Sequence, residues 1–136
     1  MKKTNIVILL IIFVGISGCF SVLFGAWLSH GGQHLPVALQ DRLSTALLYQ
    51  FIHTLALMMA IIMYRLNNSV LLVVAAIFFT LGIILFSGSL YIKTFFDVMM
   101  ITKLAPSGGL SFALAWLILG FAGTKMFQHK LGEEHK

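Results

Sequence analysis

Four long stretches of this chain carry no charge, and each is predominantly apolar. They lie between Lys3 and Asp41, Arg42 and Arg65, Arg65 and Lys93, and Lys103 and Lys125. About 20 apolar residues in a helix, rising 1.5 Å per residue, cross a hydrocarbon core of roughly 30 Å. The pattern therefore predicts four membrane spans, at residues 6–28, 43–64, 70–92 and 104–124.

Composition and backbone chemistry lead to the fold class. The chain is 60% hydrophobic and only 10% charged, which leaves too few charges to cover a water-soluble globule. In lipid the backbone must satisfy its own hydrogen bonds, so the spans are helices. Proline suits the first turn of a helix, so the second helix should begin at Pro36. We expect an all-α membrane protein, a four-transmembrane-helix bundle forming one integral membrane domain over residues 1–136, with helices at about 6–28, 36–64, 70–92 and 104–127.

Lysine and arginine in the short connections predict the orientation, because these residues favour the cytoplasmic side. One side carries six of them: Lys2, Lys3, Arg65, Lys125, Lys130 and Lys136. The other side carries three: Arg42, Lys93 and Lys103. We therefore expect both termini in the cytoplasm.

The N-terminal stretch also resembles a bacterial lipoprotein signal, with Lys2 and Lys3 followed by an apolar run and Cys19. Cleavage before Cys19 would leave about 10 apolar residues, too few to span the membrane. The residues that follow also stay apolar where a lipoprotein has a polar tether. We expect the segment to remain as the first span.

Small residues recur along three helices and predict a tightly packed bundle, because helices in lipid associate where backbones approach closely. The first helix carries Gly15, Gly18, Val22, Gly25 and Ser29, the third carries Ala75, Gly82 and Ser89, and the fourth carries Gly109, Ala113, Gly120 and Gly123.

Polar side chains gather in the half of the membrane away from the termini. His53 lies about 15 Å into the second span, near the bilayer centre, where an ionisable residue usually faces the bundle interior. Gln50 and Thr54 share its helix face. The half nearer the termini is almost purely apolar. We therefore predict an outward-facing polar pocket with these candidate ligand-binding residues: His30, Gln50, His53, Ser87, Ser89, Tyr91 and Ser107.

A structural role competes with the ligand-binding one, since serine, glutamine and histidine commonly bond across helices and a network of Gln50, His53 and Ser87 would fix helix register. We expect no catalysis, no metal and no other cofactor, because the spans hold no carboxylate and no recognisable ligand spacing. Membrane lipid is the expected partner, together with further copies or a larger membrane complex, and nothing suggests nucleic acid. Two functions are favoured: a non-enzymatic binding or accessory protein, and one that binds or transports a small molecule, ion or lipid through the pocket around His53. A third, an enzyme, is kept only because histidine can serve as an acid or a base near neutral pH.

Four short motifs resemble one family of small bacterial inner-membrane proteins, the YgdD-like family called domain of unknown function 423. The motifs are Gly25-Ala26-Trp27 with His30-Gly31, Tyr49-Gln50 with His53-Thr54-Leu55-Ala56, Gly82 with Leu85-Phe86-Ser87-Gly88-Ser89-Leu90-Tyr91, and Ala105-Pro106-Ser107-Gly108-Gly109 with Phe112 and Trp116. Leu28 stands where the family pattern has glycine. The resemblance implies a multi-pass, four-helix protein of the bacterial plasma (inner) membrane and no established activity.

Overall fold

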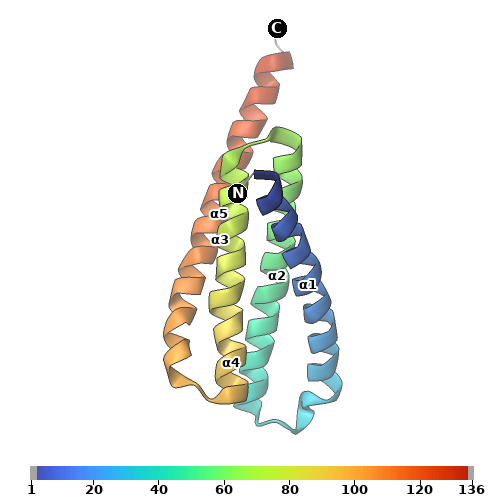
Figure 1. The fold of residues 1–136 in the computed structure, drawn as a ribbon, viewed down its shortest axis with the longest axis vertical. Coiled ribbons are helices and arrows are strands. Elements are labelled where there is room, and N and C mark those ends of the chain that lie inside the picture. The colour runs from blue at the N-terminus through green and yellow to red at the C-terminus, as the bar shows by residue number, and fades with distance from the viewer. Residues whose placement is uncertain (1–2, 135–136) are drawn as a thin grey trace.

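The computed structural model describes residues 3–134, and their helices form four long rods (Figure 1). The first two rods are α1 (Lys3–His30) and α2 (Val37–Asn67). The third rod combines α3 (Val70–Gly82), a π-helical segment η2 (Ile83–Gly88) and α4 (Ser89–Phe96), and the fourth is α5 (Ala105–Glu134). Each rod contains a stretch long and apolar enough to cross a membrane, which confirms the four predicted spans.

Most helix boundaries differ from the predicted ones by one to four residues, and the end of α5 differs by seven. Pro36 caps α2 from outside, so the helix begins one residue later than expected, at Val37. The last helix continues to Glu134 instead of ending near residue 127. No proline occurs after Pro106, so none interrupts the helix where it leaves the membrane.

Two residues in the left-handed region end helices and reverse the chain. Asn68 (φ 51°) follows α2, and its N–H bonds to the carbonyl of Tyr64 at 2.8 Å. Asp97 (φ 52°) follows α4 in the same way and bonds to Lys93 at 3.0 Å. Asparagine and aspartate tolerate this conformation better than other side-chain-bearing residues. The turn at Asn68 lies between the second and third predicted helices, which were expected to end near residue 64 and to resume at residue 70.

Both ends of the described chain lie at one end of the bundle (Figure 1). We call this the terminal end; it also holds the α2–α3 turn. The opposite, distal end holds the 3-10 helices η1 (Gly32–His34) and η3 (Met99–Leu104). The assignment of the terminal end to the cytoplasm stays a prediction.

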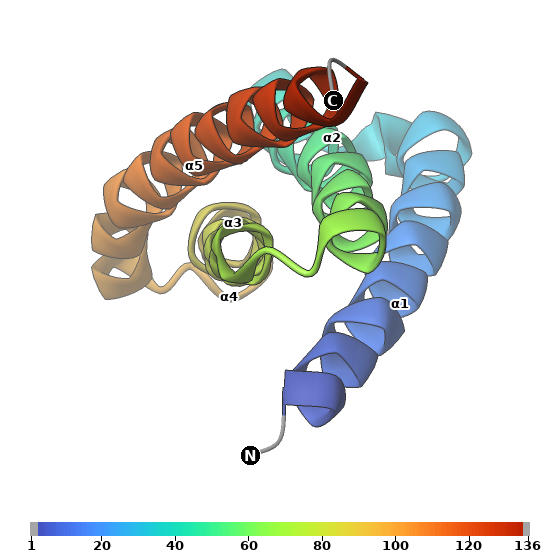
Figure 2. The same cartoon turned by 90° about the horizontal axis from the view of Figure 1, so that it is seen from above.

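The helices form an open row rather than a closed ring. Viewed from above, α3 lies between α5 and α2, and α1 packs chiefly on α2, away from α5 (Figure 2). The outer helices of the row, α1 and α5, therefore each pack mainly on one neighbouring helix. The α1–α2 pair is one edge of the row.

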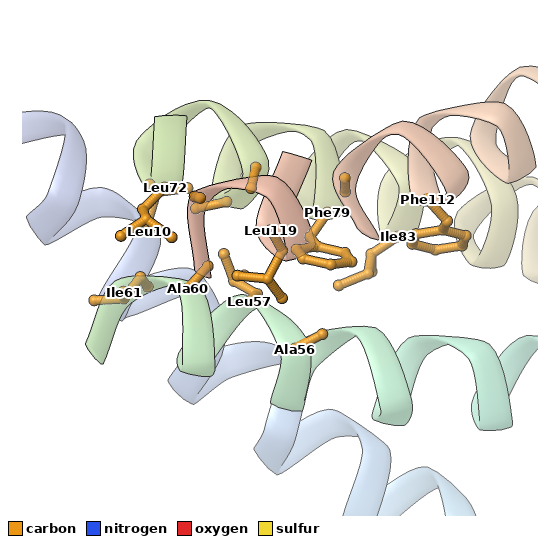
Figure 3. Packing of buried hydrophobic residues seen from close by; sticks show 14 of the residues in the cluster. Leu10, Ala56, Leu57, Ala60, Ile61, Leu72, Phe79, Ile83, Phe112 and Leu119 are labelled. Carbon is orange, nitrogen blue, oxygen red and sulfur yellow. The ribbon is translucent and has the colours of Figure 1, made fainter. Parts of the chain in front are cut away.

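The apolar core occupies the terminal half of the bundle, where small and large side chains interlock (Figure 3). Phe79, Leu57 and Leu72 are its largest fully buried side chains, and alanines fill the gaps between them. This cluster fixes α3 against α2 and α5. Most polar side chains that carry candidate chemistry lie toward the distal end, and His53 packs against Phe79 and Phe112 of this cluster.

The prediction of tight packing at small residues is right for some positions and wrong for others. Gly82 does meet a neighbouring helix, and a Cβ there would collide with Phe112. Gly108, which was not among the predicted positions, makes an equally close contact with Phe86. Apart from the local backbone of the same helix, no described atom lies within 4 Å of the place a Cβ would take at Gly15, Gly18, Gly109 or Gly120, so no neighbouring helix packs closely on these glycines. Spacing identifies a face of small residues, but in an open row that face need not meet another helix.

Candidate functional site

A buried hydrogen-bond network joins three helices at mid-depth, with Gln50 of α2 at its centre. Its side-chain nitrogen donates to Ser17 Oγ of α1 at 3.1 Å, and its side-chain oxygen accepts from the Tyr91 hydroxyl of α4 at 2.9 Å. Ser17 and Thr54 share a further hydrogen bond of 2.7 Å between their hydroxyls. Ser21 extends the network, because its hydroxyl donates to the Ser17 carbonyl at 2.9 Å. The network has the form expected of cross-helix bonds that fix register in lipid.

His53 is buried, only 6% exposed, as its predicted depth required. Its Nδ1 donates to the Tyr49 carbonyl oxygen one turn earlier, at 2.6 Å. The imidazole stacks on Phe112 of α5, with ring centroids 3.5 Å apart and planes 14° from parallel. Phe79 and Trp116 complete an aromatic enclosure. The histidine is thus held between α2 and α5.

Ser87 and Ser89 lie on the third rod and are both buried, but their hydroxyls differ. Ser89 Oγ donates to the Phe86 carbonyl at 2.8 Å. Ser87 Oγ is fully buried and has no hydrogen-bond partner among the described residues. It belongs to the π-helical turn η2, whose wider winding displaces the carbonyls that a serine would use in an α-helix. The predicted hydrogen-bond network among Gln50, His53 and Ser87 is therefore not observed, because the Gln50 side chain bonds to Ser17 of α1 and Tyr91 of α4.

The seven predicted ligand-binding residues divide into two groups. The first group is largely buried: Gln50 and Tyr91 hydrogen-bond to each other, and His53, Ser87 and Ser89 are buried in the same half of the bundle. His30 ends α1 and Ser107 lies in the first turn of α5; both side chains are exposed at the distal end. A ligand-binding role for these seven residues stays a prediction.

A groove of about 810 Å³ runs along the edge of the bundle between α1 and α2. None of the seven predicted residues lines it. Its lining is uncharged and comes from the distal parts of both helices and from the segment that joins them: Ser21, Val22, Gly25, Leu28, Ser29, Gln33, Gln40, Ser44, Leu47, Leu48 and Phe51.

The lining of the groove changes with depth. Gln33 and Gln40 lie at its distal rim, and Ser29 and Ser44 lie in the helix turns next to them. The deeper part is mainly apolar and ends near Phe51. From Gln40 to Phe51 the helix rises about 16 Å, half of a hydrocarbon core of roughly 30 Å. The groove therefore matches the depth of one lipid leaflet.

A smaller cavity of about 370 Å³ lies between α2 and α5, near His53. Its lining is apolar, with Trp116 as the one residue that also carries a polar group: Ile52, Leu55, Ala56, Met59, Trp116 and Leu119. The cavity offers space for hydrocarbon and little to orient a polar ligand.

Sequence reasoning missed the residues that line the larger groove. A signal was present, because Ser21, Gly25 and Ser29 follow one another at four-residue intervals on one helix face. Gln40 and Ser44 do the same on the partner helix. The sequence does not show that these two faces lie side by side without closing against each other.

Taken together, the fold and these features define a polytopic α-helical membrane protein with a buried polar network and a lateral groove. The chain belongs to the family described as "Protein of unknown function (DUF423)", whose model matches residues 24–109. It is a multi-pass protein of the bacterial inner membrane.

Three bacterial relatives show how far the similarity extends. A UPF0382 membrane protein of Haemophilus influenzae is 34% identical over 113 residues, which are 82% of this chain and 90% of the relative. The UPF0382 inner membrane protein YgdD of Escherichia coli K12 is 34% identical over 81% of this chain and 85% of its own length. The UPF0382 membrane protein YwdK of Bacillus subtilis is 29% identical over 85% of this chain and 95% of its own. No solved structure matches the chain.

Proposed function

We propose that this protein is a non-enzymatic binding protein that holds one amphiphilic molecule in the groove between α1 and α2. The observation that carries the proposal is the graded lining: Gln33 and Gln40 at the distal rim, and Leu47 and Phe51 deeper. A molecule with a polar head at the membrane surface and a hydrocarbon body in the leaflet has the same order of polarity.

The size and environment of the groove support this proposal. Its volume of about 810 Å³ is within the range of roughly 300–1,000 Å³ that ligand sites occupy. It lies at the edge of the helix row, where α1 has no other long helix beyond it (Figure 2). An amphiphile already in the membrane therefore has direct access.

The chemistry of the lining favours binding over catalysis. None of the eleven residues that line the groove is acidic, basic or a cysteine. Its serines have no general base in that set to activate them, and no group is present that would transfer a proton near neutral pH.

Native mass spectrometry of protein released from its membrane tests the proposal. Ser44 lines the groove and is exposed, so Ser44→Trp places an indole in the space without disturbing the core. Thr45, the next residue, is also exposed and lies outside the lining, so Thr45→Trp is the matched control. We expect a retained amphiphile on the wild type and on Thr45→Trp, and its loss from Ser44→Trp. Equal retention on all three proteins would contradict the proposal.

A second candidate function is association with another copy through the outward face of α1. Gly15, Gly18 and Cys19 lie on this face; no described atom approaches either glycine position, and Cys19 is exposed. Small residues on a lipid-facing helix allow close approach of a partner helix. The chain has one cysteine, so mild oxidation in native membranes should give a disulfide-linked dimer that Cys19→Ser abolishes. A chain that stays monomeric under oxidation would count against this candidate.

A further inference from the structure

From the hydrogen bonds at the groove's rim we infer the head chemistry of its ligand: an uncharged head rich in hydrogen-bond donors, as in a monoacylglycerol. This inference rests on the proposed function, and it concerns which amphiphiles the groove prefers.

Gln40 determines much of the rim's character. Its side-chain nitrogen donates to the carbonyl oxygens of Leu35 at 2.7 Å and Gln33 at 3.2 Å. An amide NH₂ has two hydrogens, and both are used in these bonds. The remaining polar atom of the Gln40 side chain is its oxygen, which only accepts hydrogen bonds.

Gln33 is held in a similar way. Its side-chain nitrogen donates to the Ser29 carbonyl at 2.7 Å, which ties the η1 segment to the end of α1. The second hydrogen of this NH₂ makes no hydrogen bond with a described residue, and the side-chain oxygen is again an acceptor. The hydroxyls of Ser29 and Ser44 make no hydrogen bond with any described residue, and a hydroxyl serves as donor or acceptor as its partner requires. The rim therefore offers two acceptor oxygens, one further amide N–H of Gln33 and two adaptable hydroxyls.

The fixed charges near the rim favour neither a cationic nor an anionic head, and the exposed His30 and His34, next to Ser29 and Gln33, lie outside the lining. No charged residue lines the groove, and Asp41 and Arg42, which follow Gln40, have opposite signs. The strongest competing attraction is the start of α2 at Val37, whose free N–H groups favour anions. This attraction is opposed by the side-chain oxygens of Gln33 and Gln40, which repel the oxygens of a phosphate or carboxylate. A head with several hydroxyls, each of which both donates and accepts, satisfies the two amide oxygens, the remaining Gln33 N–H and the two serine hydroxyls.

Three probes with the same oleoyl chain separate the possibilities. Monooleoylglycerol has a neutral head with donors, oleoyl lysophosphatidic acid has an anionic one, and methyl oleate has no donor. Affinities are measured by native mass spectrometry of the full chain in amine-oxide detergent, because sugar detergents would themselves compete. We expect monooleoylglycerol to bind at least about tenfold more tightly than either other probe, since two net hydrogen bonds of about 1 kcal/mol suffice for that ratio.

Two conservative variants locate the effect. Ser44→Ala removes one rim hydroxyl and should weaken monooleoylglycerol binding about fivefold while leaving methyl oleate unchanged. Thr45→Ala, outside the lining, should change neither.

The outcomes distinguish this inference from the proposed function. Equal or tighter binding of lysophosphatidic acid would overturn the head assignment and leave the groove as a binding site. An equal loss for all three probes in Ser44→Ala would overturn it as well, because it would show a change of shape. Binding of no probe, together with no effect of Ser44→Trp on retained lipid, would overturn both.

Discussion

Tyr91 and Gln50 connect α4 to α2 through a hydrogen bond of 2.9 Å between the phenolic hydroxyl and the amide oxygen. The same amide reaches Ser17 of α1 on its other side. One side chain thus joins three of the four rods at mid-depth. Because lipid supplies no competing water, this contact sets how α1 and α4 are rotated relative to α2.

Tyr91→Phe should lower the free energy of unfolding by about 1 kcal/mol, because it leaves the buried Gln50 oxygen without its donor. Unfolding by sodium dodecyl sulfate in mixed micelles, followed by circular dichroism, measures the change. Tyr49→Phe is the matched control, since Tyr49 is exposed and its hydroxyl makes no hydrogen bond with a described residue. An equal loss of unfolding free energy in both variants would show that the hydrogen bond between Tyr91 and Gln50 does not stabilise the protein.

Ser87→Ala should stabilise the protein, by about 1 kcal/mol, because it removes a buried hydroxyl that has no partner among the described residues. Ser89→Ala, two residues away, should have the opposite sign, since that hydroxyl donates to Phe86. Both are measured by the same denaturation. A clear loss of stability in Ser87→Ala would mean that the hydroxyl is satisfied in the membrane.

Gly108→Ala should destabilise the protein by about 1–3 kcal/mol, because the new methyl group would collide with the backbone at Phe86. Gly109→Ala meets open space and should be neutral or stabilising by up to about 1 kcal/mol through helix propensity. Thermal unfolding of the two purified variants in detergent compares them directly. Equal stabilities of Gly108→Ala and Gly109→Ala would contradict a close contact between α5 and the third rod at Gly108.

The orientation predicted from lysine and arginine is tested with reporter fusions. Green fluorescent protein joined after Lys136 should fluoresce, and alkaline phosphatase at the same place should be inactive. Alkaline phosphatase inserted after Gln33, between α1 and α2, should be active. The reverse pattern would place the groove in the cytoplasmic leaflet.

The four rods were predictable because lipid imposes a strict rule: a charge-free apolar stretch of sufficient length must be helical. The turn at Asn68 was predictable for a similar reason, since the residues between two spans leave little room for anything longer. The π-helical turn at Ile83–Gly88 was not, because no residue type requires it. It depends on how the third rod fits between α2 and α5.

The candidate site was predictable only in part. The burial of His53 followed from its depth, because an ionisable group avoids lipid. The bond between Gln50 and Tyr91 did not, since depth gives the level of a side chain and not the helix it faces. The groove was missed for the same reason: the sequence does not show that Gln40 and Ser44 of α2 line one groove together with Ser21 and Ser29 of α1.

The position of the groove at the edge of the helix row determines how the proposed amphiphile would reach it. A solute would arrive sideways from the surrounding leaflet, so occupancy follows its mole fraction among the lipids and not its concentration in the aqueous phase. Compounds too insoluble to titrate from buffer could therefore bind in the groove. Saturation of the groove would be set by how much of the compound the cell incorporates into that leaflet.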